Sequence, residues 1–324
     1  MPLGAGHNQP PVALLQTADA ITQKYFAPVL VDAVFKPSPS WWRITRRGRR
    51  IQGGAIVVPV VYQEETAGGA YWGAQLLDTT PYDSVRPAQW EWKFYYQPIV
   101  VPYTDVLLNS GPTQVLDLIK VKEEVAMGSL LQKLSRALYD VAPQNTALDL
   151  DSLVDAVATT NNVYAGIDRS QPANAFWQPV VINNPSGGIT MANLQDLYGR
   201  VTFGNEEPDT ILTTQAGFNA LWNLMQVNIR YPDPDEETVR AGFRRHLVFN
   251  NAVVLHDQFV PAGQLYMLNT KYTEACFHED DYFTVDPFTK PSGQRVLLSG
   301  IYVALNLKVF NPRMEAAYTG LTNA

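Results

Sequence analysis

Residues 111–141 read GPTQVLDLIKVKEEVAMGSLLQKLSRALYDV. Pro112, near the start, is a residue that the first turn of a helix tolerates, and no further proline follows until Pro143. Between them, apolar side chains recur at spacings of three and four, which places them on one helical face. These side chains are Met127, Leu130, Leu131, Leu134, Leu138 and Val141. The sequence predicts one long helix over about 112–141, roughly 40 Å in length at 1.5 Å per residue.

A hairpin pattern precedes this helix. Residues 55–63, AIVVPVVYQ, are typical of a strand, and Pro59 favours the edge of a sheet. A glycine-rich segment around Tyr71 and Trp72 follows, and residues 90–97 then alternate in character. The side chains on one face of 90–97 are Trp90, Trp92, Phe94 and Tyr96. Two strands around a glycine-rich tip predict a long hairpin, and this hairpin is expected to need a partner surface because an isolated hairpin is marginally stable in water.

The rest of the chain mixes helices and strands. Residues 1–40 contain six prolines and one helix-like run at 12–26, a pattern that favours an extended arm. Helical patterns at 189–198 and 215–227 alternate with short strands at 210–214, 252–255 and 264–268, which indicates a compact α/β subdomain. Residues 301–309 alternate between apolar and other side chains and predict a long, half-buried strand that returns to the sheet of the hairpin. The expected fold class is α+β.

Composition limits the classes of function. The chain has 324 residues, 46% of them hydrophobic, so it can bury a substantial core. A net charge of -7 argues against a dedicated nucleic-acid binder, and Cys276, the single cysteine, excludes an intramolecular disulfide. No secretion signal and no apolar run of the length needed to span a bilayer are evident, so we expect a soluble chain that does not contact membranes.

No motif of a known catalytic or cofactor site is present. The phosphate-binding GxxxxGK[ST] and GxGxxG patterns, the HExxH zinc motif and the GxSxG nucleophile motif are all missing. His256 beside Asp257, and His278 before three acidic residues, are the best metal candidates, but a satisfied histidine near a turn is the simpler interpretation. The acidic loop at 233–237 lacks the spacing of a calcium loop. We therefore expect no enzyme activity, no metal and no cofactor.

Two groups of residues are candidates for a subunit interface. Five arginines fall within residues 43–50, and arginine forms bidentate pairs with carboxylates or phosphates, so this cluster fits acidic groups on a neighbouring subunit, packaged DNA, or simply a solvated basic face. The exposed-looking aromatics are able to stack on sugars or bases, but they are more typical of a buried sheet face or an interface. The interface candidates are Arg43, Arg46, Arg47, Arg49, Arg50, Tyr71, Trp72, Trp90 and Trp92.

Five segments carry a resemblance to a known family. They are LLNSGPTQVLDLIKVKEEVAMGSLLQKLSRALYD (107–140), VATTNNVYAGIDRS (157–170), FWQPVVINN (176–184), PDTILTTQAGFNALWNLM (208–225) and GQLYMLNTKYTEACFH (263–278). In this order, together with the succession of arm, hairpin, helix, subdomain and returning strand, they resemble the major capsid proteins of tailed bacteriophages, which have the Hong Kong 97 fold. The resemblance covers roughly residues 40–318.

The resemblance implies a division into four parts: an N-terminal arm at 1–40, an extension loop at 41–92, a peripheral domain at 93–204 and 291–324 built on a spine helix at about 112–141, and an axial domain at 205–290. It also implies self-assembly into the pentamers and hexamers of an icosahedral or elongated shell that encloses double-stranded DNA, in a virion capsid assembled in the host cytoplasm. The further partners implied are a separate scaffolding protein, a portal, and weak contact with the packaged DNA. Some relatives cross-link a loop lysine to the next subunit, but no lysine lies between Lys36 and Lys93, so that bond is not expected here.

Two other classes of function stay open. A bacterial encapsulin nanocompartment has the same fold but encloses a cargo enzyme instead of DNA. A carbohydrate-binding or adhesin-like protein would use Trp72, Trp90 and Trp92 as stacking platforms and would form a discrete oligomer. An enzyme is the third choice, because the sequence offers no catalytic constellation.

Overall fold

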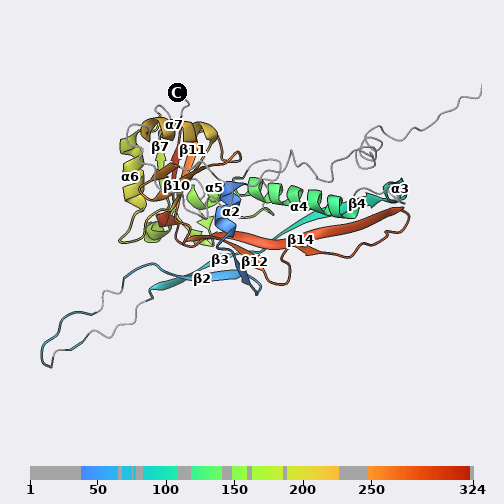
Figure 1. Ribbon diagram of the computed structural model, residues 1–324. Coiled ribbons are helices and arrows are strands. Elements are labelled where there is room, and N and C mark those ends of the chain that lie inside the picture. The colour runs from blue at the N-terminus through green and yellow to red at the C-terminus, as the bar shows by residue number, and fades with distance from the viewer. Residues whose placement is uncertain are drawn as a thin grey trace, which may run out of the picture. The chain divides into compact units, whose positions relative to one another are not determined.

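A computed structural model of the chain describes residues 38–64, 68–74, 76–77, 83–108, 118–140, 148–158, 163–184, 188–225 and 247–321 (Figure 1). Residues 1–37 of the predicted N-terminal arm, the acidic loop at 233–237, and residues 112–117 and 141 of the predicted long helix lie outside these residues. The last residues of the predicted arm are described and lead into a helix that begins at Pro39. Residues 138–140 form a turn, so the long helix ends at Ala137, short of the predicted 141. The chain forms two compact units. The first contains residues 95–132 and 281–303, and the second contains residues 37–94, 133–280 and 304–324.

The first unit is built on strands and the long helix. Its elements are β4 (Lys93–Pro102), α3 (Tyr103–Leu108), α4 (Leu118–Ala137), β13 (Thr284–Val285) and β14 (Val296–Val309), of which β4, α4 and β14 continue into the second unit. β14 pairs antiparallel with β13 and also pairs with β4. Helix α4 confirms the predicted helix over 118–137. Leu130, Leu134 and Leu138 of its predicted apolar face are buried, whereas Leu131 is exposed.

A six-stranded sheet forms the core of the second unit. Its order is β7 (Val180–Asn183), β15 (Ala316–Thr319), β11 (Gln264–Leu268), β8 (Thr210–Thr213), β10 (Ala252–His256) and β9 (Leu247–Phe249). Helices α6 (Met191–Val201) and α7 (Gln215–Met225) pack on it and share one apolar core with it. The predicted strands and helices of this region are confirmed. The sheet also includes β7 and β15, which lie outside the predicted 205–290 subdomain. They join it through pairing between β15 and both β7 and β11, strands that are distant from β15 in the chain.

The second unit also holds a smaller set of strands and helices. These are α2 (Pro39–Thr45), β1 (Arg49–Ile51), α5 (Leu153–Val157), β5 (Val163–Tyr164), β6 (Ile167–Asp168), the 3₁₀ helices η1 (Pro172–Trp177) and η2 (Pro312–Met314), and β12 (Thr273–His278). β12 lies between β1, to which it is parallel, and β14, to which it is antiparallel. The predicted long strand at 301–309 is confirmed as part of β14, but β14 pairs with β12, β13 and β4, whereas the hairpin strands at 56–61 and 85–90 form a separate two-stranded sheet.

The burial of β14 differs from the prediction. Residues 303–309 are buried on both faces, although alternation had predicted one solvated face. The reason is that the polar side chains on the second face find partners inside the protein. Lys308 pairs with Glu274, with Nζ 2.5 Å from Oε1, and the amide of Asn306 makes four hydrogen bonds. Buried polar groups with partners cost far less than unsatisfied ones, so these residues are tolerated in the interior.

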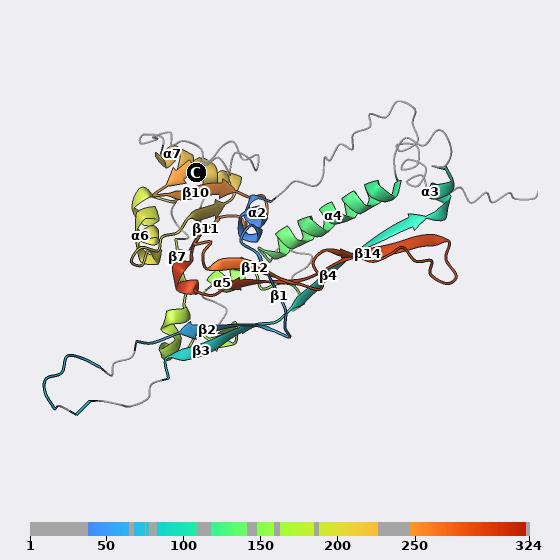
Figure 2. The same cartoon turned by 60° about the horizontal axis from the view of Figure 1, so that its bottom comes forward.

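The predicted hairpin is present, but with a different return strand. β2 (Ile56–Val61) pairs antiparallel with β3 (Val85–Trp90), and we call this pair the ribbon. The predicted partner strand, 90–97, is instead divided: β3 ends at Trp90, and β4 begins at Lys93 and pairs with β14. The alternating pattern runs through this change of partner without interruption, so periodicity alone did not reveal it. In Figures 1 and 2 the ribbon lies apart from β7, β10 and β11 of the six-stranded sheet.

Asn306 holds the linker between β3 and β4. Its Nδ2 donates to the carbonyl oxygen of Glu91 at 2.8 Å and to Oδ2 of Asp151 at 2.9 Å. Its Oδ1 accepts from the backbone N–H groups of Asp151 and Leu307, at 2.9 and 2.8 Å. Because every hydrogen-bonding position of the amide is used, a substitution that reverses donor and acceptor leaves several buried groups without a partner.

Replacement of Asn306 by aspartate is expected to destabilise the fold by about 3 kcal/mol near pH 7. The new carboxylate faces the Glu91 carbonyl and the carboxylate of Asp151, whose pKa is already raised by burial. Urea unfolding at pH 7 and at pH 5 measures the effect, which should shrink at pH 5 because a proton then bridges the carboxyl pair. The double variant Asp151→Asn, Asn306→Asp restores one donor and should recover part of the loss. Wild-type stability of the single variant at pH 7 would contradict this assignment.

Candidate assembly surface

The inner face of the ribbon packs on its own chain. Ile56, Ala88 and Trp90 are buried on this face. The ring of Trp90 lies 6.0 Å from the ring of Tyr164, edge to face, and 6.5 Å from the ring of Trp177. Aromatic pairs of this geometry stabilise beyond the area that they bury. The base of the ribbon is therefore fixed to the second unit by an apolar contact.

Polar contacts also fix strand β3 to the second unit. The N–H of Gln89 donates to the carbonyl oxygen of Ala165, in the turn between β5 and β6, at 3.0 Å. Nη1 of Arg86 donates to Oδ1 of Asn174 at 2.6 Å, and the guanidinium lies 4.4 Å from the ring centre of Tyr62. The ribbon thus has a defined direction within the second unit, set by η1 and the β5–β6 turn.

The outer face of the ribbon has no cover from the described residues. Side chains alternate between the faces of a strand, and the burial of β2 and β3 alternates accordingly. We define the outer face by its six residues, Val57, Pro59, Val61, Val85, Pro87 and Gln89, all of which are exposed or partly exposed. None of them is charged. An uncharged, apolar face on a rigid element is typical of a protein interface.

Two prolines determine how the ribbon can make contacts. Pro59 and Pro87 lie opposite each other in the register. The N–H of Tyr62 points across the ribbon to Ser84, and that of Gln89 points away from it, so by alternation the nitrogens of both prolines are at outward positions. The prolines therefore remove donors from the two outer edges without weakening the ladder between β2 and β3. This arrangement disfavours addition of a strand at either edge and favours contact through the outer face.

Beyond the ribbon, the described part of the connecting loop carries large exposed side chains. Tyr71, Trp72, Leu76 and Leu77 are all exposed, and Trp72 is 91% exposed. These residues are where a partner would contribute most burial, since tryptophan and tyrosine dominate interface energetics. The interface roles predicted for Tyr71 and Trp72 stay predictions.

A second uncharged strip lies on the first unit. Tyr96, Pro98 and Val100 of β4 are exposed, and Tyr302 of β14 is stacked on Tyr96 with ring centres 6.5 Å apart. We call these four residues the β4 strip. The face of the strand that carries Phe94 and Tyr96 was predicted to be either a sheet interior or an interface. In the single chain both side chains are exposed to solvent.

The two remaining tryptophan candidates are engaged within the chain. Trp90 is 1% exposed, so its predicted interface role is wrong: the side chain is used to close the base of the ribbon. Trp92 donates through Nε1 to the carbonyl oxygen of Gly53 at 2.7 Å and packs edge to face on His278. Of the three tryptophans proposed as a sugar-stacking platform, only Trp72 has an exposed ring, which disfavours the carbohydrate-binding hypothesis.

The five arginines separate into two kinds. Arg43 and Arg49 contact carboxylates of their own chain: Nη2 of Arg43 lies 3.9 Å from Oδ2 of Asp209, and Nε of Arg49 lies 3.2 Å from Oε2 of Glu274. The other three, Arg46, Arg47 and Arg50, are exposed. A carboxylate partner is thus supplied within the chain for Arg43 and Arg49, although the Arg49 side chain remains 71% exposed. An intersubunit role stays a prediction for all five arginines.

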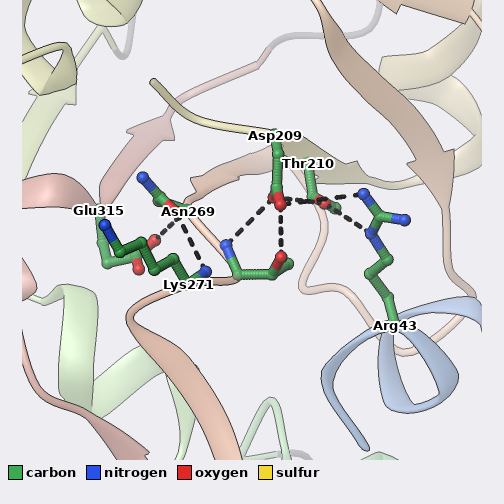
Figure 3. Close-up of polar contacts among 7 residues, drawn as sticks. Arg43, Asp209, Thr210, Asn269, Lys271 and Glu315 are labelled. Carbon is green, nitrogen blue, oxygen red and sulfur yellow. Dashed lines mark hydrogen bonds and ion pairs between the residues drawn. The ribbon is translucent and has the colours of Figure 1, made fainter. Parts of the chain in front are cut away.

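Arg43 belongs to a polar cluster that the sequence did not indicate (Figure 3). Its Nε donates to the hydroxyl of Thr210 at 3.0 Å. Asp209 accepts from the backbone N–H of Thr270 at 3.1 Å and from the Thr270 hydroxyl. Asp209 directly precedes β8, and Thr270 lies in the loop between β11 and β12. A single carboxylate therefore joins α2, the start of β8 and the loop between β11 and β12.

Glu315 extends the cluster on its other side. This carboxyl is completely buried; it accepts from the N–H of Asn269 at 3.0 Å and from the hydroxyl of Thr273 at 2.7 Å. Burial raises its pKa well above the ordinary value of a glutamate, the two hydrogen bonds lower it in part, and the charge of Asp209 raises it again. The signal missed in the sequence was a lone glutamate before a short apolar strand, which has no distinguishing pattern.

The predicted metal candidates do not assemble into a site. Among the described residues, no group of three or more His, Cys, Asp or Glu side chains is arranged to hold a metal ion. His256 packs edge to face on Phe218 at 5.6 Å, as expected for a structural histidine.

Burial raises the pKa of the Cys276 thiol to about 11, which leaves it protonated and unreactive near neutral pH. Within the described ranges, no helix is long and apolar enough to cross a membrane.

Comparison with known proteins identifies the fold. No protein-family model matches the sequence, and no curated protein sequence matches it significantly. Solved structures do match. A chain of the cyanophage A-1(L) capsid asymmetric unit has a TM-score of 0.71 at 14% identity, covering 91% of this chain and 96% of that one. The capsid of the native GTA particle gives 0.64 at 11% identity, with coverages of 90% and 93%.

A third similar structure is the SrpI encapsulin from Synechococcus elongatus PCC 7942, with a TM-score of 0.55 at 13% identity and coverages of 98% and 97%. By their descriptions, the first two are capsid structures and the third is an encapsulin complex. The chain has the α+β fold that these proteins share. It is the Hong Kong 97 fold, as predicted from the sequence.

Proposed function

We propose that this chain is a major capsid protein of a tailed bacteriophage, which assembles into pentamers and hexamers of a closed shell around double-stranded DNA. The observation that carries the proposal is the ribbon. Its inner face is fixed to its own subunit and its outer face is uncharged and uncovered, so the chain holds a preformed apolar surface in a set direction. Preorganisation of this kind lowers the entropy cost of association.

The proposed partner of the outer face is the β4 strip of another copy. Both surfaces are uncharged and mostly apolar, with Gln89 the one amide of the outer face, and both are long and narrow because each follows the direction of a strand. Contact through faces agrees with the prolines that block the ribbon edges. Covering the exposed parts of three valines contributes about 1 kcal/mol per side chain, a weak contact that becomes strong only when it is repeated over a closed shell.

The exposed arginines fit a secondary role. Arg46, Arg47 and Arg50 lie near the start of β1 on a chain whose net charge is -7. A small basic patch on an acidic protein gives weak, salt-sensitive contact with DNA, whereas a shell that bound DNA over its whole inner surface would hinder its release. A separate scaffolding protein, a portal and assembly in the host cytoplasm complete the proposal.

An encapsulin-type compartment is the second candidate. It is favoured by the similarity to the SrpI encapsulin over nearly the full length of both chains. The difference between the two candidates lies in the contents of the particle and in its environment of assembly, not in the fold of the subunit. Exposed Trp72 alone is insufficient support for the carbohydrate-binding alternative.

The full chain, expressed and purified, is expected to sediment as particles tens of nanometres across, since hundreds of weak contacts act together. Electron microscopy and gradient sedimentation measure the particles, and nuclease-protected nucleic acid or a co-purifying protein distinguishes the two candidates. Coexpression with the neighbouring genes shows whether a scaffold is required. A chain that stays monomeric under both conditions would disprove a shell function, whereas particles that hold only a cargo enzyme would favour the encapsulin.

A further inference from the structure

Two cations share one buried carboxylate beside β1. Glu274, on β12, has a side chain that is 6% exposed. Nζ of Lys308 lies 2.5 Å from Oε1 of Glu274, and Nε of Arg49 lies 3.2 Å from its Oε2. One carboxylate balances only one positive charge. The three side chains together therefore keep a surplus of one positive charge.

This surplus charge is accessible at Arg49. The side chain of Lys308 is 10% exposed, and its ammonium also lies 5.3 Å from the ring centre of Phe310, whereas the side chain of Arg49 is 71% exposed. A guanidinium has five N–H donors, of which four are on Nη1 and Nη2. The closest approach of Arg49 to Glu274 is through Nε, so the terminal N–H groups can bind a second anion.

The backbone around Arg49 is held closely on β12. A Cβ atom at Gly48 would lie only 2.9 Å from Cε2 of Phe277, so the absence of a side chain at this position lets the chain approach β12. After β1, the N–H of Glu279 donates to the carbonyl oxygen of Ile51 at 3.1 Å. Arg49 is thus held through its backbone and through its head group. A side chain held in this way loses less entropy when it binds a ligand.

Arg49 lies among further exposed arginines. No acidic residue occurs between Asp32 and Glu64 in the sequence, and residues 279–281, which are acidic, follow β12 beyond Ile51, at the other end of β1. Four arginines fall within five residues, a length of chain that spans at most about 14 Å. One strand of DNA carries about four phosphates over the same length. The exposed arginines are Arg46, Arg47, Arg49 and Arg50.

We propose that these four arginines form a phosphate-binding strip, in which Glu274 orients Arg49, and that the ligand of the strip is the phosphodiester backbone of a nucleic acid. A carboxylate on another copy would compensate a single guanidinium, whereas a nucleic-acid backbone presents successive negative charges to all four. Contacts to phosphates carry no sequence information, so binding should be independent of the base sequence. The inference rests on the proposed function for the presence of DNA, but the strip itself lies within one subunit.

Fluorescence anisotropy of a short labelled DNA duplex tests the strip. The duplex is titrated with the full-length protein, below the concentration at which particles form, from about 50 to about 200 mM salt. The wild type should bind at the low end of this range and lose affinity as salt is added. Arg49→Gln should bind about tenfold more weakly, with a salt slope smaller by about 1. Arg49→Lys keeps the charge but not the fork that Glu274 orients, so its affinity should fall about threefold with an unchanged slope.

Arg200 supplies the matched control. It is an exposed arginine on α6 whose Nη2 pairs with Oδ2 of Asp196 at 2.9 Å, and its side chain is 59% exposed. Arg200→Gln and Arg200→Lys make the same changes of charge and shape outside the strip. Both should leave the affinity and the salt slope of the wild type unchanged. Circular dichroism melting shows that all four variants fold.

Three results would overturn the strip. The first is no binding by the wild type at about 50 mM salt. The second is an equal loss of affinity in Arg49→Gln and Arg200→Gln, or wild-type affinity in Arg49→Lys, since either would mean that only net charge matters. The third is unchanged DNA binding in the Arg49 variants together with a loss of particles, which would assign Arg49 to a carboxylate of another copy. Failure of the wild type to form particles does not affect the anisotropy, so the strip and the shell function are tested separately.

Discussion

Lysine substitution of both Val57 and Val61 is expected to abolish particle formation and to leave the subunit folded. The two side chains are 55% and 70% exposed on the outer face of the ribbon, so lysine is well hydrated there in a single subunit and costs a few tenths of a kcal/mol. In the proposed shell the same face is covered by another copy. Each buried ammonium group without a partner then costs several kcal/mol, and the cost recurs at every subunit.

Val163→Lys is the matched control for this double variant. Val163 lies on β5, outside the ribbon, and is 54% exposed, so the substitution has the same chemistry and starts from nearly the same exposure. It is expected to leave particle yield unchanged. Sedimentation and electron microscopy measure the yield, and circular dichroism melting shows that all variants fold. Wild-type yield of particles from the double variant would mean that the outer face of the ribbon is not an assembly surface.

The parts of the fold that the sequence predicted are those with a long repeat. Helix α4 and strand β14 each extend over more than two turns or several alternations, so their periodicities stand out. The ribbon was marked by its glycine-rich tip and by Pro59. Local patterns of this kind depend only on backbone geometry and on residues that are close together in the chain, so a single sequence is enough to show them.

The parts that the sequence did not predict depend on partners that are distant in the chain. The division of 90–97 between β3 and β4 is a change of hydrogen-bonding partner, and it leaves the alternation of side chains intact. The burial of both faces of β14 required Glu91 and Asp151 to lie beside Asn306. The carboxyl pair of Asp209 and Glu315 is separated by about a hundred residues and becomes visible only when β8, β11 and β15 are adjacent. Trp90 was assigned to an interface for the same reason, because its partners Tyr164 and Trp177 lie far along the chain.

Trp90→Ala is expected to destabilise the subunit by about 4 kcal/mol. The ring is 1% exposed and fills the space between Tyr164, Trp177 and the start of β2, so its removal leaves a cavity that the surrounding rigid rings cannot close. Urea unfolding below the concentration at which particles form measures the loss. Trp72→Ala is the control: the same deletion at a 91% exposed ring should change the stability of the subunit by less than about 0.5 kcal/mol.

The two tryptophan variants should also affect assembly differently. Trp72→Ala keeps a stable subunit and loses burial at the loop, so particles should form only at higher protein concentration. Trp90→Ala keeps the outer face of the ribbon but frees its base, because the contact with Tyr164 and Trp177 fixes the ribbon's direction. Copies with variably directed ribbons cannot close a regular shell, so this variant should give irregular or open assemblies at temperatures at which it remains folded. Regular closed particles from folded Trp90→Ala would show that the aromatic base stabilises the subunit without positioning the ribbon.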